Sequence, residues 1–127
     1  MTYSIKKQVQ TTIEVAIIRT KEALKKEGFG VLTEIDVRKT LKEKLDVDYD
    51  KYIILGACNP PFAFKALKSE KEVGLLLPCN VIVFEEDNKV FVSAIKPSVA
   101  MNMISNDKLQ TIAGEVESKL KKVVNLI

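Results

Sequence analysis

The chain has 127 residues, 20 Lys and Arg against 17 Asp and Glu, and no His, which makes its formal net charge +3. This length accommodates a single domain over residues 1–127. The absence of His excludes Ser–His and Cys–His nucleophile pairs, imidazole bases and zinc sites that use His, and two Cys residues cannot form a Cys₄ site.

No membrane or export segment is predicted. The longest uncharged runs, 52–64 and 73–84, are too short to span a bilayer, and the N-terminus lacks the continuous apolar stretch of a signal peptide. Lys is mixed with Glu along the whole chain, and the chain contains only Arg19 and Arg38 as arginines, a pattern that argues against a nucleic-acid partner. We therefore expect a cytoplasmic protein with reduced thiols and no membrane partner.

The first predicted elements are a strand and a helix. Apolar and polar residues alternate over 3–9, which predicts a strand. Thr11 and Glu14 form a capping box at the start of a helix that ends at Gly28.

A second strand and a second helix follow. The strand is predicted over 29–36, where only Leu32 breaks the alternation. Asp36 is a suitable N-cap for a helix whose apolar face carries Val37, Leu41 and Leu45.

The middle of the chain predicts a buried strand and a helix. The run from Tyr52 to Cys58 is apolar throughout, which is typical of a strand covered on both faces. Asn59 and Pro60 fit the N-cap and the first position of the next helix.

The last part predicts a hairpin and two helices. Strands over 79–86 and 89–95 are joined by a two-residue turn at Asp87 and Asn88. A short helix over 97–103 and a long amphipathic helix capped by Asp107 complete the chain.

The resulting order β-α-β-α-β-α-β-β-α-α predicts an α+β fold. We expect a two-layer α/β sandwich, with a mixed sheet and with helices mainly on one face. The strand segments 81–84 and 90–92 are apolar on both sides. A second subunit or the late helices should therefore cover the other face of the sheet.

Two Cys-Asn motifs lie at predicted strand ends. Cys58 and Asn59 follow Gly56, which allows a backbone or a ligand to approach closely, and Cys79 and Asn80 open the next strand. A helix N-terminus after Cys58 would favour its thiolate. Equally, a Cys can be a small buried hydrophobe and Asn59 can simply cap a helix. If the two cysteines lie close together on neighbouring strands, their thiols could form a disulfide or bind a soft metal ion as two thiolates.

Three segments then carry a resemblance. GFGVLTEIDV (28–37), LGACNPP (55–61) and GLLLPCNV (74–81) resemble, in this order, the signature blocks of the domain-of-unknown-function 302 family. The resemblance implies a small two-layer α/β domain that tends to form homodimers, and it implies no established activity. It also implies a pocket without an assigned role at four positions: Cys58, Asn59, Cys79 and Asn80.

Three hypotheses of function remain open from the sequence. The first is a homodimeric binding module that holds a small molecule or a soft metal near the two Cys-Asn motifs, with no cofactor and no definite metal ligands assigned. The second is a thiol-dependent enzyme or redox protein that uses Cys58 as a low-pKa nucleophile. The third is an interaction or scaffold domain without a pocket. The first two require Cys58 and Cys79 to meet beside a hollow.

Overall fold

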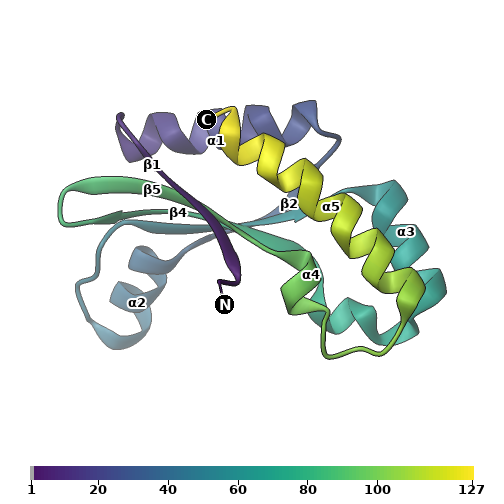
Figure 1. Cartoon of the computed structure of the whole chain (residues 1–127). Coiled ribbons are helices and arrows are strands. Elements are labelled where there is room, and N and C mark those ends of the chain that lie inside the picture. Colours follow the sequence, from purple (N-terminus) through teal and green to yellow (C-terminus); the bar gives the residue numbers. More distant parts are fainter. Residues whose placement is uncertain (1) are drawn as a thin grey trace.

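A five-stranded sheet forms the centre of the molecule (Figure 1). The computed structural model describes residues 2–127. In spatial order the strands are β1 Ser4–Val9, β5 Lys89–Ile95, β4 Cys79–Glu86, β3 Tyr52–Cys58 and β2 Gly30–Asp36. The α/β class and the order of these elements are confirmed.

The sheet is antiparallel throughout, so the predicted mixed sheet is wrong in this respect. Strands β2, β3, β4 and β5 follow one another as neighbours, and each connection reverses the direction of the chain. The two strands that run in the same direction at the start of the chain, β1 and β2, lie at opposite edges and never pair. To form a parallel pair, β2 would have had to lie beside β1, with α1 as the crossover connection between them.

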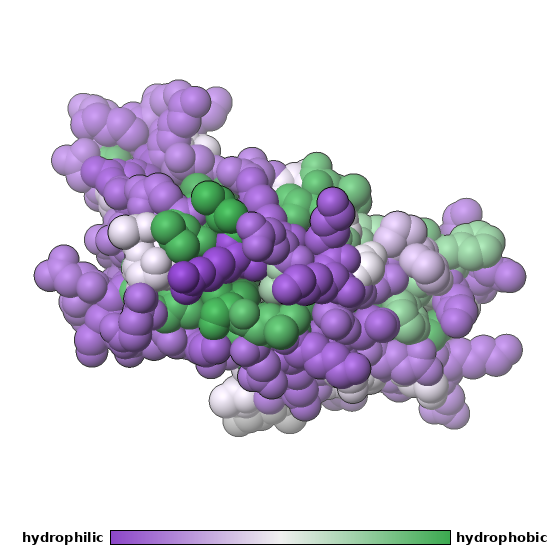
Figure 2. Space-filling model, turned by 90° about the horizontal axis from the view of Figure 1, so that it is seen from above, coloured by the Kyte–Doolittle hydropathy of each residue, from purple (hydrophilic) through white to green (hydrophobic). Residues whose placement is uncertain are grey.

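Helices cover mainly one face of the sheet. α1 and α5 lie together on that face, and α2 lies on the other side (Figure 1). From the side of α1 and α5 the surface is mostly hydrophilic, with separate apolar areas between the polar side chains (Figure 2). α4 ends at Ala100, before the predicted end at Met103. The helices are α1 Ile13–Lys26, α2 Val37–Leu45, α3 Pro60–Ser69, α4 Pro97–Ala100 and α5 Asp107–Asn125, with a 3₁₀ helix η1 at Lys71–Leu76.

The helix starts follow local capping chemistry. Asp36 caps α2 as predicted, since its carboxylate accepts the backbone N–H of Lys39 at 3.0 Å. Thr12 caps α1 in place of the predicted Thr11, and Asn106 caps α5 one residue before the predicted position. In both cases two adjacent residues are suitable caps, so the residue type alone does not select between them.

The main core lies between the sheet and the pair α1 and α5. Its fully buried side chains come from both layers and include Leu24, Leu55, Val81, Val83, Val92 and Leu120. The strand residues among them lie at every second position of their strands where one strand contributes two, as with Val81 and Val83, because a pleated strand turns alternate side chains to the helix-covered face.

The opposite face of the sheet is covered largely by its own side chains. Tyr52, Phe84 and Phe91 stack across β3, β4 and β5, with ring centroids 5.4 and 5.3 Å apart. Lys6 places its Nζ 4.6 Å from the centroid of the Phe91 ring. The late helix α5 packs on the same face as α1, against the main core. It therefore does not cover this opposite face, which was one of the two covers predicted from the apolar strand segments.

A bulge in β2 explains the residue that broke the alternation. Val31 pairs with Ala57 and Thr33 pairs with Gly56, which leaves Leu32 as an extra residue without a partner. A bulge bends the strand and redirects the side chain at that point. Leu32 remains 66% exposed and borders the cavity described below.

Candidate functional site: an apolar cavity at the strand ends

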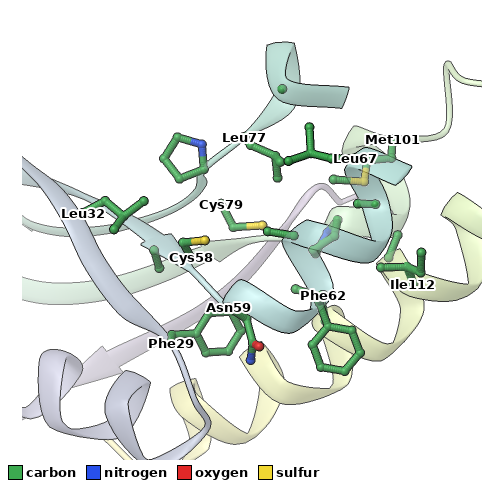
Figure 3. A pocket seen from close by; sticks show the side chains of 18 residues that line it. Phe29, Leu32, Cys58, Asn59, Phe62, Leu67, Leu77, Cys79, Met101 and Ile112 are labelled. Atoms are coloured by element: carbon green, nitrogen blue, oxygen red, sulfur yellow. The ribbon is translucent and has the colours of Figure 1, made fainter. Parts of the chain in front are cut away.

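A cavity of about 340 Å³ lies where the end of the sheet meets α3 and α5 (Figure 3). Its walls are almost entirely hydrocarbon, and two rim residues, Leu32 and Leu67, remain 66% and 40% exposed. This volume is within the range of small-molecule sites. Besides these two, the lining residues are Phe29, Ala57, Cys58, Asn59, Phe62, Ala63, Ala66, Gly74, Leu77, Pro78, Cys79, Pro97, Met101, Ile112, Ala113 and Val116.

Both cysteines lie in the wall of this cavity. Cys79 pairs with Ala57 across β3 and β4, so Cys58 is the next residue along β3 (Figure 3). Cys79 is buried and Cys58 is half-buried, and both thiols are free. Both thiols therefore border the same hollow.

Asn59 is a structural residue of the cavity wall. Its side-chain amide donates a hydrogen bond to the carbonyl oxygen of Glu27 at 3.1 Å, beyond the last turn of α1. It occupies the N-cap position of α3 as predicted, but its side chain makes no capping hydrogen bond to that helix. A polar side chain of the cavity thus ties α3 to the end of α1.

Asn80 is the one predicted site residue that lies elsewhere. It pairs with Gly56 in the sheet and is exposed, and it does not line the cavity. Adjacent residues of a strand point to opposite faces, so the position that buries Cys79 turns Asn80 away. The structure therefore brings together Cys58, Asn59 and Cys79.

The cavity is electrically neutral. None of the lining residues, all within the described 2–127, carries a charged side chain. Burial raises the pKa of the Cys79 thiol to about 11, and the neighbouring Cys58 adds to the effect. Cys79 therefore keeps its proton at neutral pH. No general base faces either thiol, and no group of three or more metal-binding side chains occurs among residues 2–127.

Alkylation against pH should reveal this raised pKa. In the native protein we expect the midpoint for Cys79 near 11, against about 8.5 in urea, because only the thiolate reacts. Below the unfolded pKa the buried thiol contributes its full stabilisation, which is lost as the pH rises through the folded pKa. Cys79→Ala should flatten the fall in stability over that interval. A native midpoint near 8.5 contradicts the burial argument.

Most of the cavity wall was not predicted as a site. Leu32, Phe62, Met101 and Ile112 are apolar and were assigned to packing or to no role. Their only signal was weak: Leu32 breaks the alternation of its strand, and Ile112 belongs to the apolar stripe of the last helix. Apolar side chains that line a hollow follow the same pattern in sequence as side chains that fill a core.

A link between α4 and α5 supports the cavity wall. Glu117 accepts hydrogen bonds from the backbone N–H and the hydroxyl of Ser98, next to Pro97 of the lining. Partial burial alone would raise the pKa of Glu117, but Ser98 and the charges of Lys121 and Lys96 outweigh it and lower the pKa. The link therefore stabilises the fold at neutral pH and is lost in acid.

None of the described helices is long and apolar enough to cross a membrane. A family model described as "Domain of unknown function DUF302" matches residues 5–127. The crystal structure of an uncharacterised conserved protein DUF302 from Bacillus stearothermophilus superposes with a TM-score of 0.93, at 32% sequence identity and with 98% of each chain covered. No curated protein matches this chain significantly.

Proposed function

This chain belongs to the DUF302 family, whose description states no activity, and from this premise we propose that the domain is a binding module for a small, largely apolar molecule. The observation that carries the proposal is the 340 Å³ cavity with hydrocarbon walls and an open rim. A hollow of this kind favours a ligand that removes apolar surface from water. The two free thiols suit a reducing compartment, so we expect the domain to act in the cytoplasm.

The thiols contribute to this proposal as small, uncharged parts of the wall. A nucleophilic Cys58 would need a base or a cation beside it, and the lining contains neither. A two-thiolate metal site would require Cys79 to give up a proton that its burial retains. Binding of a neutral apolar group requires no such step.

Binding of 1-octanol tests the proposal by calorimetry and thermal shift. Wild type should bind octanol and gain thermal stability, because a ligand that binds only the folded state stabilises it. Ala63→Leu adds volume at a half-buried lining position of α3 and should weaken binding at least tenfold.

The matched control is Ala100→Leu, which makes the same change at a half-buried position outside the lining. It should leave octanol affinity within twofold of wild type. Absence of octanol binding to wild type, or equal loss in both variants, rejects the cavity as the site.

The predicted homodimer is part of this proposal. The face of the sheet that carries Tyr52, Phe84 and Phe91 supports it, because these side chains are only half-buried in the single chain. Light scattering should give twice the 14.2 kDa chain mass at micromolar concentration. Ile82→Glu places a charge at the centre of that face, on β4, and should yield a folded monomer. Met103→Glu, at a position that is 77% exposed beyond α4, should remain dimeric. A monomeric wild type contradicts the homodimer and leaves the cavity proposal standing.

A further inference from the structure

A basic groove lies beside the apolar cavity. It runs between α3 and α5 and is lined by Lys65, Lys68, Ser69, Lys108, Thr111 and Ile112. Three of these six residues are lysines, and none of the six is acidic. The groove therefore presents a positive field that no carboxylate of its own lining cancels.

Helix geometry gathers these lysines. Lys65 and Lys68 are three residues apart on α3, which puts them on one face of that helix. Lys108 and Thr111 stand in the same relation on α5, which packs against α3. Residues of two helices that are distant in the chain therefore face one hollow.

The groove and the cavity meet at Ile112. Ile112 lines both hollows, so it forms part of the wall between them. Phe62 lines the cavity, and its ring is approached by the Nζ atoms of Lys65 at 5.4 Å and Lys119 at 5.9 Å from the centroid. The apolar wall of the cavity and the lysine-bearing wall of the groove thus adjoin at the Ile112 side chain.

We propose that the ligand is a small amphiphile whose apolar chain occupies the cavity and whose anionic head, such as the carboxylate of a medium-chain acid, lies among Lys65, Lys68 and Lys108. This inference rests on the proposed function and adds the chemical class of the ligand. A fully apolar ligand would use none of the lysines. A cationic head would be repelled by them, and a head group placed in the cavity itself would meet no charged partner.

Three probes with the same chain and different heads test the proposal: octanoate, 1-octanol and octylammonium. Calorimetry at low salt should show that octanoate binds wild type at least tenfold more tightly than octanol, and octylammonium more weakly than octanol. Added salt should reduce the advantage of octanoate, because ions screen an exposed charge contact. Octanoate is used below its micelle concentration, so binding reports the monomeric carboxylate and not a lipid surface.

A triple variant, Lys65→Gln, Lys68→Gln and Lys108→Gln, should bind octanoate and octanol equally, with octanol affinity unchanged. The control replaces three lysines outside the groove, Lys26, Lys39 and Lys44, with Gln and so makes the same change in net charge. It should keep the tenfold preference.

The outcomes separate the two proposals. If octanol binds wild type as tightly as octanoate does, the anionic head is rejected while the cavity proposal stands. The same conclusion follows if both triple variants lose the preference alike, because net charge then explains it. If neither octanol nor octanoate binds, the proposed function itself fails.

Discussion

Gly56→Ala is expected to lower the free energy of unfolding by about 2–3 kcal/mol, within the range measured for overpacked cores. A Cβ at this position would lie 2.8 Å from Cγ of Pro78 and closer still to the Thr33 hydroxyl oxygen. Both contacts are with side chains, so the Thr33 side chain must rotate and the Pro78 ring must move to admit the methyl group. Because Pro78 also lines the cavity, the shift should distort the shape of the cavity.

Chemical denaturation of the variant and of Gly30→Ala measures this effect. A Cβ at Gly30, in the same region of the sheet, would meet nothing within 4 Å. This control should change stability by less than about 0.5 kcal/mol, the usual range for a surface site without special contacts. Equal stability of the two variants would show that β3 and its neighbours have room at Gly56, which contradicts the close approach that the structure describes.

Asn59→Leu should destabilise the fold by about 1–3 kcal/mol, because the Glu27 carbonyl loses its side-chain donor in a partly buried place. Leu is close to Asn in shape, so the loss is mainly that of a hydrogen bond. Asn59 also lies against Gly28, which has φ of +85° at the end of α1 and holds the chain in a turn that favours glycine. Loss of the amide should therefore loosen α1 against α3.

The second Cys-Asn motif provides the matched control. Asn80 is exposed and outside the cavity, so Asn80→Leu should change stability by less than about 0.5 kcal/mol. Thermal denaturation of both variants compares two residues that the sequence treats alike. A similar, small effect in both would show that the Asn59 amide does not support the wall.

The cavity and its lining also bear on the rival hypotheses. A scaffold without a pocket predicts a filled region around Cys58, whereas the structure shows an open cavity there. A thiol enzyme predicts charged or basic groups near Cys58, and the lining consists of uncharged side chains. Binding of a neutral or amphiphilic molecule remains the function that the geometry supports best.

Local sequence signals were sufficient for most secondary structure. The apolar run Tyr52–Cys58 was predicted with the bounds that the structure has, since Lys51 and Asn59 end it on either side. Asp87 and Asn88 form the hairpin turn with φ of 51° and 63°, which short polar side chains tolerate. Such features depend on a few neighbouring residues, so the sequence alone is sufficient to predict them.

The order and direction of strands depend on contacts between distant residues, and here the sequence was ambiguous. A helix between two strands is compatible with a parallel or an antiparallel neighbour, so a mixed sheet was predicted where all pairs are antiparallel. The bulge at Leu32 depends on the pairing of β2 with β3, and a single broken alternation did not identify it.

The sequence by itself determined the α/β class, the strand and helix segments, and the pair of cysteines as the place to look for a site. Only the tertiary structure decided that Cys58, Asn59 and Cys79 share a cavity while Asn80 faces away, and that lysines of α3 and α5 lie beside it. The physical reason is that secondary structure follows from short-range backbone and side-chain preferences. A cavity instead arises where elements distant in sequence pack without filling the space between them.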